Sequence, residues 1–173
     1  MQRIPAIAGC AFLLAITSAW AVGKDKAQYV GGSLDVPESS QGKLDTQKDA
    51  TALLFVYEWT TPGDGAWSRQ PSVQKHSGEV RVPYSGVATI EYGQQVGRRV
   101  GAAILVSPAF LFSKGRKHFL TLTYKDAAGV DQVVILQLGK DVVRTTLAIL
   151  KARTGKEIQF QDEEARKQMG GGR

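Results

Sequence analysis

The chain is poor in the residue types that most often carry metal or covalent chemistry. Its 173 residues include a single cysteine, Cys10, and two histidines, His76 and His118. The histidines lie in separate segments and lack the i, i+4 spacing of a metal-binding helix. Asparagine does not occur, so the chain has no acceptor for N-glycosylation. We therefore predict no metal site and no cofactor.

Sequence patterns of common enzymes are also missing. Neither the G-x-S-x-G turn of serine hydrolases nor a glycine-rich phosphate-binding loop occurs in the chain. The paired carboxylates Glu163 and Glu164 lie in a polar C-terminal stretch, where they favour solubility. Nothing in the sequence organises a nucleophile, a base and an oxyanion site together. We therefore predict that the protein is not an enzyme.

Residues 1–21 have the pattern of a signal peptide. Arg3 supplies the positive start, an apolar segment follows around residues 11–16, and Ala19-Trp20-Ala21 supplies the small residues of a cleavage site. The alternative is an uncleaved anchor, but the apolar segment is shorter than the ~20 residues that a spanning helix needs. We expect a mature chain that begins at Val22 and is exported, either periplasmic or secreted, with a position peripheral to a membrane as one alternative.

Cys10 ends a stretch, Ile7 to Cys10, that is similar to a lipoprotein processing site. Its position argues against lipidation, because the longer apolar segment of the leader follows Cys10. Once the leader is removed, the mature chain has no cysteine at all. Disulfides, thiol nucleophiles and cysteine-bound metals are then excluded.

The charge balance is moderately basic. The full chain has 22 basic and 16 acidic side chains, a net charge of +6, and the leader removes only Arg3. Such a balance favours anionic partners. Because exported proteins seldom meet nucleic acid, we expect an anionic lipid or a protein partner and no nucleic acid.

The mature chain alternates apolar and polar residues in the manner of β-strands over a single domain, residues 22–160. Strands are predicted at residues 27–34, 43–46, 52–58, 79–84, 87–92, 117–124 and 132–138. The last two form a hairpin, since Gly129 in the Asp126–Gly129 turn suits a left-handed position. A short extended piece is expected at residues 158–160.

A helix is predicted after the last long strand, capped by Asp141 and ended by Gly155. Its apolar stripe consists of Val142, Val143, Thr146, Leu147, Ile149 and Leu150. Lys151 and Arg153 in the last turn suit the helix dipole. Residues 161–173 are polar and rich in glycine, and we expect them to be disordered.

The order of about seven strands followed by one helix predicts a mainly β fold, because no helices alternate with the strands. The segments VPYSGVATIEYG, KHFLTLTYKD and LGKDVVRTTLAIL resemble those of bacterial PH-like and GRAM-like domains, over roughly residues 27–160. That resemblance implies a partial barrel of antiparallel strands closed by its amphipathic C-terminal helix. The chain departs from the pattern by an apolar insertion between late strands, residues 96–117.

The polar stretch from Trp59 to Ser77 is predicted to be a long loop, since it contains two prolines and two glycines between strands. Loops of this length often bind ligands. The residues of interest in it are Trp59, Trp67, Arg69 and His76. The alternative is a variable insertion whose tryptophans pack back onto the sheet.

The most unusual segment is an apolar run, Val100 to Phe112, with basic residues on both sides. One hypothesis places segment 96–118 on an anionic membrane, with apolar side chains at the interface and cations on the head groups. The residues concerned are Arg98, Arg99, Ile104, Leu105, Phe110, Leu111, Phe112, Lys114, Arg116 and Lys117. The alternative packs residues 100–112 as core of a periplasmic domain that binds a protein, for instance by strand addition at an open sheet edge.

Overall fold

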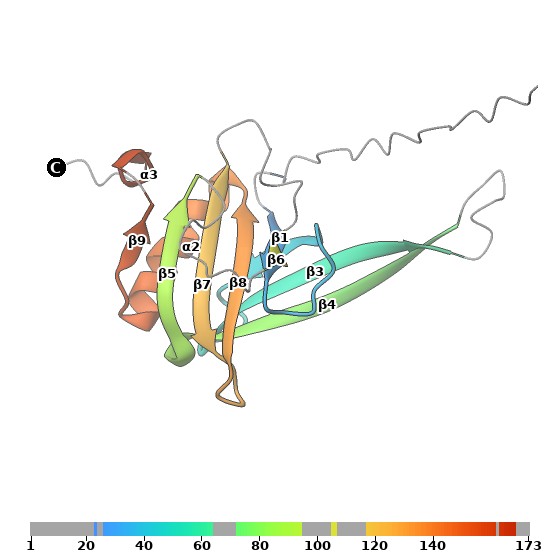
Figure 1. Ribbon diagram of the computed structural model, residues 1–173, viewed down its shortest axis with the longest axis horizontal. Helices are drawn as coiled ribbons and strands as arrows, with labels where there is room; N and C mark the ends of the chain where they lie inside the picture. The colour runs from blue at the N-terminus through green and yellow to red at the C-terminus, as the bar shows by residue number, and fades with distance from the viewer. Residues whose placement is uncertain are drawn as a thin grey trace, which may run out of the picture.

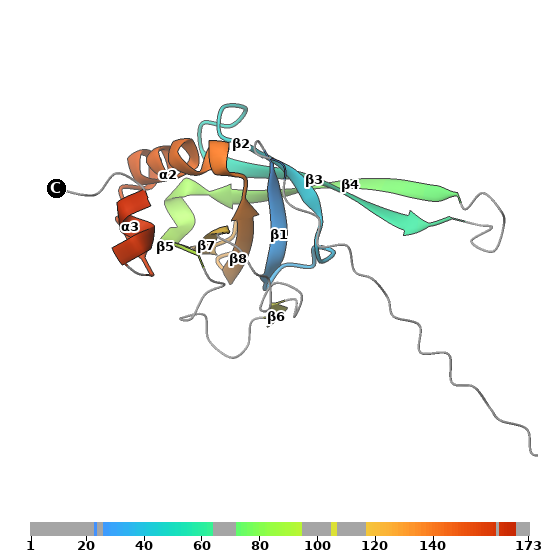
Figure 2. The same cartoon turned by 90° about the horizontal axis from the view of Figure 1, so that it is seen from above.

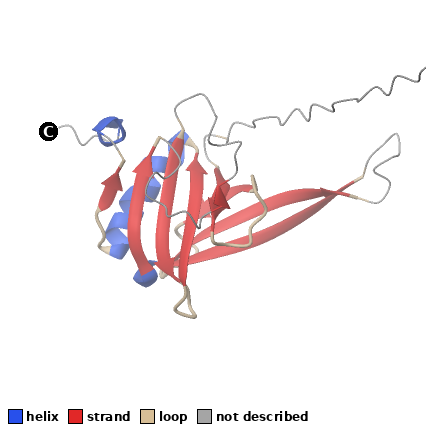
Figure 3. Ribbon diagram, viewed as in Figure 1, coloured by secondary structure: helices blue, strands red, loops and turns tan. Residues whose placement is uncertain are grey.

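The computed structural model describes residues 23, 26–63, 72–94, 105–106, 117–161 and 163–168. Within these residues the chain forms one sheet, with the strand order β4-β3-β2-β1-β8-β7-β5-β9 and with β6 paired to β1. Figures 1 and 3 show this curved sheet with its helices. The strands are β1 (Ala27–Gly32), β2 (Gln41–Asp45), β3 (Ala52–Pro62), β4 (Val73–Pro83), β5 (Val87–Gly93), β6 (Leu105–Val106), β7 (His118–Lys125), β8 (Asp131–Leu138) and β9 (Ile158–Phe160).

The predicted mainly β fold, a partial barrel with a C-terminal helix, is confirmed. The sheet stays open, because β4 and β9 stand at its two ends. All pairings are antiparallel except that of β9, which runs parallel to β5 after the helix. The seven predicted strands correspond to β1–β5, β7 and β8, and the expected extended piece is β9. The two-residue strand β6 was not predicted, because no alternation can be read from two residues.

The C-terminal helix α2 (Lys140–Thr154) covers one face of the sheet (Figure 2). Its buried side chains are Val143, Thr146, Leu147 and Leu150, four members of the predicted stripe. Gly155, with φ 67°, ends the helix in the left-handed conformation as predicted. The predicted cap was wrong: Gly139 holds the N-cap position without a side-chain bond, and Asp141 lies in the first turn. There its negative charge still suits the positive end of the helix dipole.

The main core lies between α2 and the sheet. Strand side chains alternate between the two faces, so every second residue of β3, β7 and β8 points toward α2. The largest buried members of this core are Leu53, Phe55, Ile90, Tyr92, Leu120, Leu122, Tyr124, Leu136, Leu147 and Leu150. We call this set, together with the smaller residues packed on it, the main core.

Residues 161–173 differ in part from the expected disorder. A short helix, α3 (Glu163–Gln168), follows β9, and Ala165 within it is fully buried against the main core. The polar composition of this stretch gave no sign of the contact. A single small apolar residue is enough to hold a short helix on a surface. Nothing is described beyond residue 168.

Candidate functional site

The hairpin of β3 and β4 extends beyond the rest of the sheet. The two strands, 11 residues each, pair from Ala52 with Pro83 to Pro62 with Val73. The neighbouring strand β2 covers the other edge of β3 only from Leu54 to Glu58. From Trp59 outward the hairpin is therefore a two-stranded ribbon, and it projects away from the body of the protein (Figure 1). We call the paired segments 59–62 and 73–76 the arm.

A column of aromatic rings runs from the main core onto the arm. Ring centroids lie 5.4 Å apart for Phe55 and Tyr57, and 5.6 Å apart for Tyr57 and Trp59. Trp59 then stacks on His76 of the partner strand at 5.1 Å, and His76 Nε2 lies 2.8 Å from Thr61 Oγ1. Cross-strand aromatic pairs stabilise a ribbon that has few other neighbours. The column therefore stabilises the base of the arm.

Gly78 is required where the column leaves the body. A Cβ atom at this position would lie 2.6 Å from the ring of Tyr57, which is its partner across the hairpin. A real Cβ could not fit so close to the ring. Glycine at this position lets the Tyr57 ring lie flat against the backbone of β4, and the column continues toward Trp59.

The outer edge of β4 is open. Within the described residues, no strand pairs with β4 on the side away from β3. Near the body, side chains from the β2–β3 connection reach β4, since Asp49 forms an ion pair with Arg81, and Lys48 lies 3.5 Å from Glu79. Toward the tip, Val73 is 60% exposed. An open strand edge of this kind is a template for pairing with another chain.

The prediction of a loop from Trp59 to Ser77 was wrong for residues 59–62 and 73–77, which belong to β3 and β4. Trp59 and His76 lie on strands and face each other in register. The prolines suggested a loop, but Pro62 is the last residue of β3, where a missing N–H does little harm. The other two residues of this predicted site, Trp67 and Arg69, lie outside the described residues.

Most of the basic, apolar segment 96–118 also lies outside the described residues. This applies to Arg98, Arg99, Ile104, Phe110, Leu111, Phe112, Lys114 and Arg116. The backbone of Leu105 and Val106 forms β6, which pairs with Gly32 and Gly31 of β1. Lys117 is half-buried, and desolvation lowers the pKa of its ammonium group. The pairing of β6 with β1 played no part in the prediction of a membrane-facing surface, because it cannot be recognised from a sequence of two residues.

A buried tyrosine and a half-buried histidine meet where β5 ends and β7 begins. Tyr92 is fully buried, and its Oη lies 2.6 Å from Nδ1 of His118. Phe160 of β9 packs edge-on against the Tyr92 ring, with 6.1 Å between centroids. Burial lowers the pKa of His118 from its ordinary value of 6.5. The neutral ring can accept a hydrogen bond from the Tyr92 hydroxyl at Nδ1, so His118 is tied to the main core through Tyr92.

His118 should make the stability of the protein depend on pH. Its pKa is lower in the folded chain than in the unfolded chain, so the unfolded chain binds the extra proton first as the pH falls. The contribution of neutral His118 is complete above the unfolded pKa and declines below it. In urea melts between pH 7.5 and 5, the wild type should lose more stability than His118→Gln. Equal losses in the two proteins would contradict this assignment.

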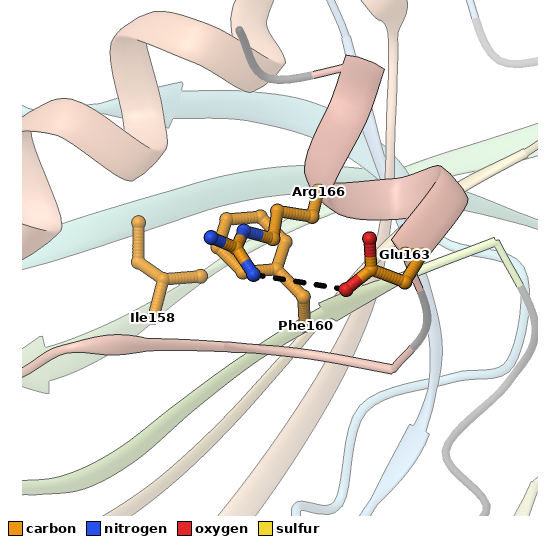
Figure 4. A pocket seen from close by; sticks show the side chains of 4 residues that line it. All are labelled: Ile158, Phe160, Glu163 and Arg166. Carbon is orange, nitrogen blue, oxygen red and sulfur yellow. Dashed lines mark ion pairs between the residues drawn. The ribbon is translucent and has the colours of Figure 1, made fainter. Parts of the chain in front are cut away.

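A shallow depression lies beside α3 and is lined by Ile158, Phe160, Glu163 and Arg166 (Figure 4). In it, Arg166 Nη1 lies 3.7 Å from Glu163 Oε1, one helical turn away. Both charged side chains are largely exposed, and such ion pairs contribute little to stability. The depression therefore presents one carboxylate and one guanidinium above two apolar side chains.

Across the described residues, no three side chains of His, Cys, Asp or Glu lie together as metal ligands would. In the same part of the chain, every helix is too short or too polar to cross a bilayer.

Comparison of the sequence with protein-family models and with curated proteins, and of the fold with solved structures, found no match. The resemblance to PH-like and GRAM-like domains therefore stays a prediction. The arm is the feature from which a function can be argued.

Proposed function

We propose that this protein is an exported, non-catalytic binding module that captures an extended segment of a protein partner on the open edge of β4. The partner segment would add to the sheet as a further strand, with main-chain hydrogen bonds supplying affinity. The periplasm or the extracellular space is the proposed location, on the strength of the N-terminal signal-peptide pattern. No cofactor or metal is needed for this activity.

The observation that carries the proposal is the projecting arm with its open edge. A ribbon held by only two strands is marginal on its own, since isolated hairpins are barely stable in water. This chain nevertheless maintains one by stacking Trp59 on Tyr57 and His76. Beyond Trp59, no described side chain of the arm belongs to the main core, because the strands project beyond β2 there. A maintained element that contributes this little to the core is best explained by contact with another molecule.

The chemistry of the arm favours a peptide as the occupant. Backbone N–H and C=O groups along β4 are complementary to those of any extended chain. Val73 and Lys75 lie on one face of the ribbon, and Trp59 with His76 lies on the other. A partner strand would place alternate side chains against these two faces, and specificity would come from those contacts. The same edge also suits a second copy of this chain, so an experiment must distinguish self-association from binding of another protein.

Site-specific photo-crosslinking tests the proposal with a matched control. Val73 on the arm and Val130 in the β7–β8 turn are similarly exposed, at 60% and 53%. A photoreactive phenylalanine analogue at position 73 should crosslink a discrete protein in the native host, whereas the same analogue at position 130 should not. Equal crosslinking at both positions, or none at position 73, would contradict the proposal. A crosslinked product of twice the chain mass would assign the edge to self-association.

A further inference from the structure

The hydrogen bonds of the β3–β4 hairpin determine which backbone groups face the open edge of β4. Opposite residues of an antiparallel pair alternate between pairs that exchange two N–H···O=C bonds and pairs that exchange none. At the outer end, the Gly63 N–H donates to the Ser72 carbonyl over 2.9 Å. At the inner end, the Tyr84 N–H donates to the Thr51 carbonyl, also over 2.9 Å. Both bonds give the same alternation along the hairpin, in which even-numbered residues of β4 bond to β3. The odd-numbered residues of β4 therefore direct their backbone groups toward the open edge.

Six residues make up this row of edge-directed backbone groups: Val73, Lys75, Ser77, Glu79, Arg81 and Pro83. Pro83 has no N–H group to offer, so pairing with another strand is weakened there. Glu79 and Arg81 are already held by their ion pairs with the β2–β3 connection. None of the ion pairs between described residues involves the outer three members of the row. An added strand therefore has room from Val73 to Ser77.

Lys75 lies at the centre of this available part of the edge. Its side chain is exposed, and its register partner on β3 is Thr60, which carries no charge. The acidic residue Glu58 is on the same face of β3 but pairs with Ser77 instead. An added strand would place one side chain directly beside Lys75 on the open side. Opposite charges in such a cross-strand pair stabilise the pairing, and like charges destabilise it.

The other face of the arm offers an aromatic contact next to this charge. Trp59 and His76 are both half-buried, and their rings stack with 5.1 Å between centroids. The contact of His76 Nε2 with Thr61 Oγ1, at 2.8 Å, holds the imidazole in this position. The side chain of an added strand opposite His76 would lie on the open side of the imidazole. An aromatic ring there would continue the column of stacked rings by one member.

We propose that the segment captured by β4 carries, from its N- to its C-terminus, an aromatic residue, an aspartate or glutamate, any residue, and an aliphatic residue. Antiparallel addition, the more stable kind, places these residues opposite His76, Lys75, Gln74 and Val73 in that order. The aliphatic residue then packs on Val73, which is 60% exposed. This inference rests on the function proposed above, strand addition at β4, and it specifies the sequence that is recognised.

Charge reversal beside the photoreactive position tests the acidic preference. The chain with the photoreactive analogue at position 73 is compared in the native host with the same chain carrying Lys75→Arg, Lys75→Glu or Lys156→Glu. Lys156 is exposed between α2 and β9, at the other end of the sheet from β4, so it controls for net charge. Lys75→Glu should lower the yield of crosslinked partner at least about threefold, and the other two variants should change it by less than about twofold. Equal yields for Lys75→Glu and Lys156→Glu would overturn the inference and leave strand addition standing.

Mass spectrometry of the crosslinked peptide gives a second readout on the chain that keeps Lys75. The partner residue joined to position 73 should have an aspartate or glutamate two residues before it and an aromatic residue three residues before it. A discrete partner without a carboxylate at that place would overturn the inference alone. No crosslinked partner from any of these chains, or a product of twice the chain mass, would contradict the proposed function and this inference with it.

Discussion

Replacing Leu147 by alanine is expected to lower the free energy of unfolding by about 2 to 5 kcal/mol, the range for buried leucine deletions in a packed core. Leu147 is fully buried on the face of α2 that meets the sheet. The neighbouring strands are fixed by their own hydrogen bonds, so they cannot move inward to fill the space. The loss should therefore fall in the upper part of this range, and urea melts at neutral pH would measure it.

Thr145 provides the matched control on the same helix. It is exposed on the opposite side of α2, and Thr145→Ala removes a β-branched residue from a helical position. The expected change is within about 0.5 kcal/mol, as for most surface substitutions. Similar losses for Leu147→Ala and Thr145→Ala would mean that α2 does not pack on the sheet through the face described above.

Much of the fold could be predicted because it depends on local patterns. Alternation identified β5, β7 and β8, and the spacing of Val143, Leu147 and Leu150 identified the buried face of α2. Gly155 was predicted to end the helix, since its left-handed conformation is favourable mainly for glycine. Each of these features can be read within a few residues, so a single sequence is enough to find them.

The arm was missed because its stabilisation is not local. Trp59 and His76 are separated by a stretch that contains prolines and glycines, and only their pairing across the hairpin makes them neighbours. The same holds for β6, which depends on Gly31 and Gly32 far earlier in the chain. One signal was available in the sequence: Tyr57 and Trp59 continue the alternation of β3 past Glu58, which could have extended that strand.

What buries the second face of β7 and β8 could not have been predicted either. Both strands carry apolar residues on two faces, with Phe119 and Ile135 opposite the main core. Such strands are buried on two sides, but their sequence does not say what buries the second side. This is why the run Val100–Phe112 was compatible with both a membrane surface and a core.

Shortening the arm tests whether β3 and β4 project in order to bind a protein partner and not in order to fold. Thr60 and Lys75 are register partners, so residues 61–74 can be replaced by an Asn-Gly turn that leaves Trp59 and His76 in place. The free energy of unfolding should change by less than about 1 kcal/mol, because the strand residues that are deleted, 61–62 and 73–74, lie outside the main core. Tagged full-length and shortened chains would then be compared by size-exclusion chromatography of native envelope extracts. We expect the full-length chain to elute in a larger complex and the shortened chain as a monomer, whereas a complex that survives the shortening would contradict a binding role for the arm.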